Sequence, residues 1–246
     1  MTGDGQKTLA SSGPPAFPGP SPGPAAWRAP ALHYQEVKAR LVRAKWALAD
    51  TVPRWNPVSW SYDRLPPLRP EQEAACAAWR QAHGRGIVVM PTGTGKTEVA
   101  LALMKETALS TLIVVPIRDL LYQWQRRIRD CLGYGAGIIG DSRHEIRPVS
   151  VATYDSACLG MEEFGDRFGL IIFDECHHLP GNLRREAALM SAAPRRLGLT
   201  ATLEPAEPGG SRDRCLALAK LIGPVCYRLP LAEVRGRTLA EYEVVR

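Results

Sequence analysis

The stretch VVMPTGTGKTEV, residues 88–99, decides the fold of this chain. A short, fully apolar run at 86–90, GIVVM, predicts a buried β-strand, and the run that follows at 95–108, GKTEVALALMKETA, predicts a helix. Between the two, Gly93 and Gly95 permit a tight turn whose backbone N–H groups face inward. A strand, a tight turn and the positive end of a helix, in this order, are typical of a loop that holds phosphate groups.

The same stretch supplies the residues of a predicted nucleotide site. Lys96 would reach the β- and γ-phosphates, and the hydroxyl of Thr97 would bind Mg²⁺. The general phosphate-loop pattern G-x-x-x-x-G-K-[ST] is broken in one place, because Met90 occupies the first glycine position and Pro91 then makes the turn. The residues expected around the phosphates are Pro91, Thr92, Gly93, Thr94, Gly95, Lys96 and Thr97.

Outward from this stretch, apolar strands alternate with amphipathic helices. Further strands are predicted at 111–116, 148–154, 168–175 and 195–202. Further helices are predicted at 69–82, 118–132, 183–193 and 211–223. Strands that are apolar on both sides and alternate with helices indicate a parallel sheet covered by helices on both faces, so the predicted fold class is α/β.

The N-terminal part has a different composition. Residues 1–26 are rich in Pro, Gly, Ser and Ala. Such a segment buries too little apolar surface to offset its ordering entropy, so we predict a disordered tail. A ligand for a proline-binding module is the weaker alternative.

Residues 27–66 are predicted to form a small accessory segment, with helical periodicity over 31–48. Its three tryptophans, Trp46, Trp55 and Trp60, could stack on nucleic-acid bases. Packing of a small subdomain against its neighbour is the favoured interpretation.

Bulk composition limits the possible classes of protein. There are 31 basic and 25 acidic residues, a net charge of +6, which leans towards a polyanionic partner without establishing one. The six scattered cysteines form no C-x-x-C pair and fit a reduced, cytoplasmic protein. No apolar run approaches the roughly 18 residues that span a bilayer, and the N-terminus lacks a signal-peptide pattern. We therefore expect no membrane partner.

The stretch LIIFDECHH, residues 170–178, predicts the second part of the site. An apolar strand delivers Asp174 and Glu175 at its carboxyl end, which is where open α/β sheets bind ligands. Asp174 would hold Mg²⁺, and Glu175 would orient and deprotonate the attacking water. The adjacent Cys, His and His do not suggest zinc, because three consecutive residues at a strand end point in different directions.

Five motifs, in order, carry a resemblance to a known family. MPTGTGKT (90–97), DECHH (174–178) and LTAT (199–202) resemble motifs I, II and III of the superfamily 2 helicases. VVPIRDLLYQW (114–124) looks like motif Ia, and VATYDS (151–156) looks like motif Ib.

The resemblance is closest to one branch of this superfamily. LRPEQ (68–72) is similar to the upstream glutamine segment that recognises adenine. Together with DECHH and GDSRHEIRPVSVATYDS (140–156), it resembles the XPB-like and related DEAD/DEAH-type DNA helicases. The match covers about residues 66–246 and implies a RecA-like P-loop lobe over 67–246 that binds ATP and Mg²⁺.

The resemblance also implies a role for individual residues. Gln72 would contact the adenine edge, and Lys96, Asp174 and Glu175 would be the catalytic residues. Coupling of the nucleotide site to nucleic acid or to a second lobe would involve His178, Thr200 and Thr202. Arg118 and Thr153 would face the backbone of single-stranded or duplex DNA, bound without sequence preference. Two alternatives stay open: Arg118 as a solvated helix start, and Thr153 as a cap at a strand end.

The family has a second lobe with an arginine motif, Q-x-x-G-R-x-x-R, and this string does not occur in the 246 residues. The segment EVRGRTLAEYEVVR (233–246) is expected to be a connector into a second lobe, which could act in trans. The expected function is the ATP-binding lobe of an ATP-dependent DNA helicase or translocase, with weak ATP hydrolysis in isolation.

Two alternatives to a motor lobe stay open. A non-motor module that binds nucleotide and nucleic acid is the main one. A small-molecule kinase is less favoured, because DECHH and LTAT have no reason to accompany such an enzyme.

Overall fold

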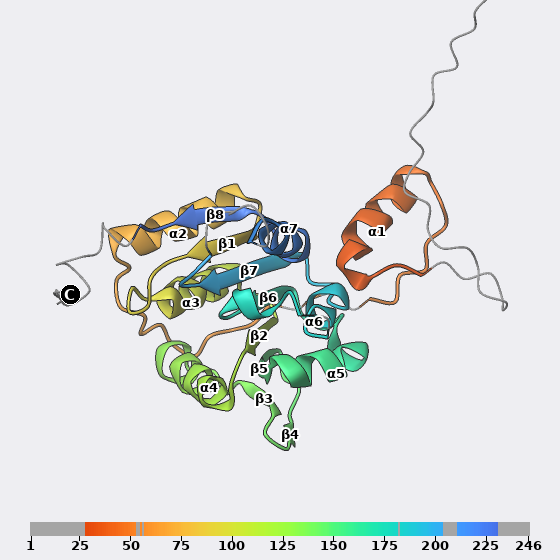
Figure 1. Ribbon diagram of the computed structural model, residues 1–246. Coiled ribbons are helices and arrows are strands. Elements are labelled where there is room, and N and C mark those ends of the chain that lie inside the picture. Colours follow the sequence, from red (N-terminus) through yellow and green to blue (C-terminus); the bar gives the residue numbers. More distant parts are fainter. Residues whose placement is uncertain (1–27, 53–54, 56, 182, 204–210, 231–246) are drawn as a thin grey trace, which may run out of the picture.

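An eight-stranded sheet forms the centre of the protein (Figure 1). The computed structural model describes residues 28–230 except 53–54, 56, 182 and 204–210. The predicted tail at 1–26 and the predicted connector at 233–246 lie outside the described residues. The strands are β1 (Arg85–Val89), β2 (Thr111–Val115), β3 (Gly137–Gly140), β4 (Arg143–His144), β5 (Val149–Thr153), β6 (Leu170–Phe173), β7 (Arg195–Thr200) and β8 (Val225–Arg228).

Their order across the sheet is β4-β3-β5-β2-β6-β7-β1-β8. All neighbouring strands are parallel, except β3 and β4, which form an antiparallel pair at one edge. The helical segments are η1 (Ala31–His33), α1 (Tyr34–Arg43), α2 (Pro70–Gln81), α3 (Lys96–Thr107), α4 (Arg118–Leu132), α5 (Tyr154–Phe164), η2 (Cys176–His178), α6 (Glu186–Leu189) and α7 (Ser211–Leu221).

Side chains of the strands alternate between two apolar cores, one on each face of the sheet. In β2, Ile113 and Val115 pack with residues of α2, α3 and α4, whereas Leu112 and Val114 pack with residues of α5, α6 and α7. Figure 1 shows the two groups of helices on opposite sides of the sheet. Because consecutive side chains of a strand point to opposite faces, a sheet covered on both sides needs strands that are apolar throughout. The predicted α/β fold class is therefore confirmed.

Several elements differ from the predictions. The helix α5 was not predicted, because it starts directly after β5 without a separating loop, and Thr153 both ends the strand and caps the helix. The pair β3–β4 and the edge strand β8 were also missed, since they are short. The helix predicted over 183–193 contains only the four α-helical residues of α6.

The accessory segment also differs in part from its prediction. The helix α1 ends at Arg43, because Lys45 adopts a left-handed conformation with φ 57°. Trp46 therefore lies beyond the helix and is 70% exposed. Trp55 donates a hydrogen bond from Nε1 to the carbonyl of Asp166 (2.9 Å), and Trp60 packs edge-on against Tyr134. The packing interpretation thus holds for two of the three tryptophans.

Within the described part of the chain, no helix is both long and apolar enough to span a bilayer.

A buried arginine joins β7 to the loops and helices around it. Arg196 is fully buried, and its guanidinium donates hydrogen bonds to four backbone carbonyls, those of Ala188, Ser191, Ala193 and Leu221. Burial lowers its pKa to about 9. The planar fork of arginine supplies five donors, which suits four acceptors arranged around it.

Substitution of Arg196 by lysine should therefore destabilise the fold. An ammonium has three donors on a flexible stem, so at least one buried carbonyl would lose its partner, at a cost of about 1–3 kcal/mol. Chemical denaturation followed by circular dichroism would measure the loss in unfolding free energy. The neighbouring Arg195 is exposed, and Arg195→Lys is the matched control, with stability close to wild type. Equal stability of the two variants would contradict the role assigned to Arg196.

Candidate nucleotide-binding site

Three adjacent parallel strands bring the predicted motifs together. In the sheet, β7 lies between β6 and β1 and pairs in parallel with both. The carboxyl ends of parallel strands meet at one edge, so the segments that follow them are neighbours. These segments are the phosphate-loop sequence after β1, the acidic pair after β6 and the T-x-T sequence after β7.

The turn between β1 and α3 has the backbone geometry of a phosphate loop. Gly93 and Gly95 both have positive φ angles, 78° and 84°. A Cβ on Gly95 would lie 2.2 Å from Nε2 of Gln72, so only glycine fits there. Thr94 is fully buried, and its hydroxyl donates to the carbonyl of Pro91 (2.6 Å). The hydroxyl of Thr94 therefore holds the turn itself, while Thr92 and Gly93 are exposed.

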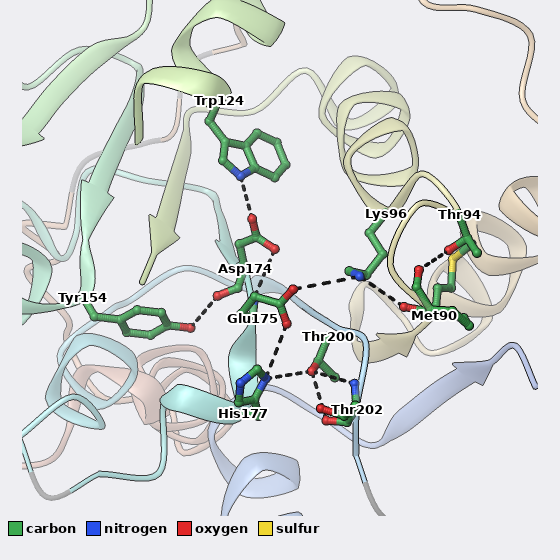
Figure 2. Close-up of polar contacts among 11 residues, drawn as sticks. Met90, Thr94, Lys96, Trp124, Tyr154, Asp174, Glu175, His177, Thr200 and Thr202 are labelled. Carbon is green, nitrogen blue, oxygen red and sulfur yellow. Dashed lines mark hydrogen bonds and ion pairs between the residues drawn. The ribbon is translucent and has the colours of Figure 1, made fainter. Parts of the chain in front are cut away.

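Lys96 spans the space between this turn and the acidic pair. Its Nζ donates to the carbonyl of Met90 (3.1 Å) and lies 3.9 Å from Oε1 of Glu175 (Figure 2). The side chain is only 11% exposed, so its charge acts in a partly water-excluded space. A cation in such a place attracts anionic phosphate more strongly than one on the open surface.

Asp174 is buried, and the protein holds it through its backbone and its carboxylate. Its Oδ2 accepts a hydrogen bond from Nε1 of Trp124 (2.8 Å), and its Oδ1 accepts one from the backbone N–H of Glu175 (3.0 Å). Its carbonyl accepts from the hydroxyl of Tyr154 (3.0 Å). Burial raises the pKa of Asp174, and the hydrogen bond from Trp124 is the largest effect opposing that rise. Sequence reasoning assigned no role to Trp124 or Tyr154.

The donor atoms at this edge fit a nucleotide with Mg²⁺. Each carboxylate oxygen of Asp174 accepts one hydrogen bond and has two lone pairs, so each keeps acceptor capacity. The hydroxyl of Thr97 has no hydrogen-bond partner among the described residues, and it follows the loop lysine directly. A carboxylate and a hydroxyl are the hard oxygen ligands that Mg²⁺ binds while keeping several waters. The glycine turn and Lys96 supply the complementary groups for phosphate.

A line of polar contacts runs from Glu175 to the T-x-T sequence (Figure 2). Glu175 adopts a left-handed conformation (φ 45°), and its Oε2 lies 3.4 Å from Nδ1 of His177. The same Nδ1 lies 3.0 Å from the hydroxyl oxygen of Thr200, which donates to the carbonyl of Thr202 (3.1 Å). Because Nδ1 faces two oxygen atoms, and the hydroxyl proton of Thr200 goes to Thr202, we place the imidazole proton on Nδ1.

This contact involves the neighbour of a histidine that was predicted for coupling. The histidine that meets Thr200 is His177, whereas coupling was predicted for His178, which is exposed and stacks on the His177 ring at 4.2 Å between centroids. The three-residue turn η2 carries both histidines, and only His177 contacts Thr200. The sequence held the signal, because His177 is the fourth residue when the D-E-x-H pattern is counted from Asp174. A coupling role for His178 stays a prediction.

Gln72 has protein partners at both ends of its amide. Its Nε2 donates to the carbonyl of Thr94 (2.9 Å), and its Oε1 accepts from the backbone N–H of Arg69 (2.9 Å). Gln72 thus joins the start of α2 to the phosphate loop. One N–H and one lone pair of the amide remain, and an adenine edge needs one of each. Its contact with adenine stays a prediction.

The two residues expected to face nucleic acid lie on the next strands along the same edge. Arg118 starts α4 after β2, is 67% exposed and forms an ion pair with Asp141 (2.8 Å). Thr153 ends β5, and its hydroxyl accepts from the backbone N–H of Ser156 (3.2 Å), which caps α5. The structure thus gives each residue the simpler role that the sequence had left open, and it leaves their contact with nucleic acid untested.

Comparison with known proteins places these features in a family. The sequence pattern of the family described as "Type III restriction enzyme, res subunit" matches residues 65–205, more than half of the chain. The chain belongs to this family. The matched residues contain the phosphate loop, the acidic pair and the T-x-T sequence. The relatives described next place the chain in the XPB-like branch of the superfamily 2 helicases, as an N-terminal lobe.

Curated relatives match the chain over much of its length. A protein named DNA 3'-5' translocase XPB2, from Sulfurisphaera tokodaii, is 38% identical over 219 residues, which is 89% of this chain and 48% of that protein. The DNA 3'-5' helicase XPB of Mycobacterium tuberculosis is 37% identical over 67% of this chain and 30% of its own length. The XPB-like lobe therefore spans about half of the first relative and less than a third of the second.

Solved structures share the fold of the lobe. The UvsW helicase from bacteriophage T4 superposes with a TM-score of 0.54 at 16% identity, over 80% of this chain and 78% of that one. The SWI2/SNF2 ATPase core of Sulfolobus solfataricus, solved with double-stranded DNA, gives a TM-score of 0.54 at 18% identity, over 69% and 37%. At these identities the similarity concerns the fold alone.

Proposed function

We propose that this chain is the ATP-binding lobe of an ATP-dependent DNA translocase or helicase. The observation that carries the proposal is the parallel arrangement of β6, β7 and β1, with a lysine-bearing glycine turn, an acidic pair and a T-x-T sequence at one edge. The relatives named as a DNA translocase and a DNA helicase support it, as do the family motifs in their order.

The proposed cofactors are ATP and Mg²⁺, and each residue has a distinct task. Lys96 meets the β- and γ-phosphates, and Thr97 and Asp174 hold the metal. Bound Mg²⁺ neutralises charge on the phosphate oxygens. Glu175 accepts a proton from the attacking water, and His177, whose Nδ1 lies 3.4 Å from Oε2 of Glu175, orients that carboxylate.

The proposed partner is DNA, single-stranded or duplex, bound through its backbone. Support comes from Arg118 on the edge next to the nucleotide site and from the net charge of +6. A module that binds both ligands without a motor function is not favoured, because the relatives are named as a translocase and helicases. None of the six cysteines is in a disulfide, which agrees with the proposed cytoplasmic location.

Loss of the loop lysine should abolish most nucleotide affinity. A charge-assisted contact contributes about 1.5–3 kcal/mol, so Lys96→Ala should weaken ATP·Mg²⁺ binding roughly ten- to hundredfold. Isothermal titration calorimetry on folded protein would measure it. Lys105 lies on the same helix and is more exposed, so Lys105→Ala is a matched control with unchanged affinity. Equal binding by wild type and Lys96→Ala would remove the nucleotide site from this edge.

We further propose that the polypeptide of residues 1–246, tested alone, hydrolyses ATP slowly and does not unwind duplexes. Where an arginine finger completes such a site, it raises the rate by about 10³–10⁵. We expect a second-lobe polypeptide, added in trans, to raise turnover. The assay is steady-state ATPase with and without DNA, and Glu175→Gln is the control for the residual activity. Robust DNA-stimulated turnover by 1–246, lost in Glu175→Gln, would show that the finger is supplied in another way.

Binding to DNA should depend steeply on salt, because phosphate contacts release counterions. Arg118→Ala should weaken binding to single-stranded DNA of any sequence and lower the slope of log affinity against log salt by about 1. Fluorescence anisotropy at several salt concentrations would measure both. Arg129, at the other end of the same helix, provides Arg129→Ala, with the same change in charge and no expected change in slope. Salt-independent binding would refute the backbone-contact proposal.

A further inference from the structure

The side chain that fixes the Asp174 carboxylate comes from α4. Trp124 is almost completely buried, and its Nε1 donates to Oδ2 of Asp174 at 2.8 Å. Figure 2 shows the indole directed at this carboxylate from the side away from Lys96. The other hydrogen bond to the carboxylate comes from the backbone N–H of Glu175. Among the described side chains, Trp124 alone donates a hydrogen bond to this carboxylate.

Backbone contacts fix the rest of Asp174. Its N–H donates to the carbonyl of Val114 in β2 (2.9 Å), and its carbonyl accepts from the Tyr154 hydroxyl (3.0 Å). With the main chain held on both sides, the remaining freedom of Asp174 is rotation of its side chain. The hydrogen bonds from Trp124 and from the backbone N–H of Glu175 restrict that rotation and leave one lone pair on each carboxylate oxygen for other ligands.

A second contact fixes the helix that carries the indole. Arg127, one turn further along α4, forms an ion pair with Glu98 in the first turn of α3. The ion pair ties α4 to the helix that follows the phosphate loop. The indole is therefore held in place relative to both halves of the proposed metal site, the Thr97 hydroxyl on α3 and the Asp174 carboxylate after β6.

We propose that Trp124 is a positioning residue that orients the Asp174 carboxylate for the Mg²⁺ of a bound nucleotide. The proposal rests on the proposed function of this edge as a site for ATP and Mg²⁺. Groups that hydrogen-bond a metal ligand affect metal affinity, typically by ten- to hundredfold, although they do not touch the metal. The indole acts through Asp174 alone and contacts neither nucleotide nor metal.

The chain contains a second tryptophan that separates this role from simple packing. Trp79 on α2 is also fully buried, and its Nε1 donates to a backbone carbonyl, that of Arg196, at 2.9 Å. Removal of either indole costs a similar buried volume and one hydrogen bond. Only Trp124 directs its donor at a proposed metal ligand, so Trp79→Phe is a matched control for Trp124→Phe.

The experiment measures the Mg²⁺ dependence of nucleotide affinity. The dissociation constant of AMP-PNP, a non-hydrolysable ATP analogue, is determined by calorimetry with Mg²⁺ and with EDTA. The EDTA value divided by the Mg²⁺ value is the ratio that reports the metal contribution. Trp124→Phe should lower this ratio on the order of tenfold by weakening only the Mg²⁺ measurement. Trp79→Phe should leave the ratio at its wild-type value.

Two further variants make the outcome decisive. Benzothienylalanine at position 124 replaces the indole N–H by sulfur with the ring shape kept, so it tests the donor even where Trp124→Phe fails to fold. Asp174→Asn should remove the Mg²⁺ effect, and Trp124→Phe added to Asp174→Asn should cause no further change, as expected of residues that act as one unit.

Two results would overturn the proposal: both dissociation constants unchanged from wild type in both position-124 variants, or an equal weakening with Mg²⁺ and with EDTA, which leaves the ratio unchanged. If Asp174→Asn also keeps the full Mg²⁺ effect, the proposed metal site itself is wrong. The Asp174→Asn variant therefore distinguishes failure of the metal site from failure of the positioning role of Trp124.

Discussion

The parallel pairing of the central strands is the constraint on which the site depends. Residues that are distant in sequence, such as Lys96 and Glu175, meet because β1, β7 and β6 run in the same direction and end at the same edge. A parallel strand usually returns through a helix, so this arrangement places helices on both faces and makes the central strands apolar throughout. The two cores and the polar edge are thus consequences of one arrangement of strands.

The buried carboxylate at this edge has an energetic cost. Burial raises the pKa of Asp174, so its ionised form disfavours folding at neutral pH, and protonation as the pH falls through the raised pKa removes that cost. The hydrogen bond from Trp124 offsets part of the effect, the backbone N–H of Glu175 and the charge of Lys96 contribute less, and the charge of Glu175 adds to it. A buried carboxyl whose pKa is shifted by burial and by neighbouring charges is typical of a site selected for chemistry rather than for stability.

The sequence predicted the centre of this protein better than its periphery, for a physical reason. The strand–turn–helix at 85–107 and the acidic strand end at Asp174 depend on local patterns, namely apolar runs, glycines and a helix start. Contacts between distant elements, such as Trp124 with Asp174, have no local signal in the sequence. The packing of the whole sheet decides which helix lies next to the carboxylate. Short edge elements such as β8 and the β3–β4 pair have too few residues for periodicity to show.

The two adjacent histidines show a different limit of sequence analysis. His177 and His178 are the same residue type, so composition and hydropathy cannot distinguish them. Only their position distinguishes them, because His177 is the fourth residue of the D-E-x-H pattern that begins at Asp174. The structure adds the reason that this count matters. The left-handed Glu175 starts a tight three-residue turn, and the first histidine of the pair meets Thr200 at 3.0 Å while the second is left exposed.

The order of strands along the edge also brings the acidic pair close to the helices that follow β2 and β5. Moving from β1 through β7 and β6 to β2 and β5, the segments after the strands change from the phosphate loop to the starts of α4 and α5. Both of these helices return to the acidic pair, α4 through Trp124 on the carboxylate and α5 through Tyr154 on the carbonyl of Asp174. Because the interior is close-packed, a ligand that displaced either helix start would also displace a group bonded to Asp174. Asp174 is thus bonded to side chains from the helices that follow two other strands of the same edge.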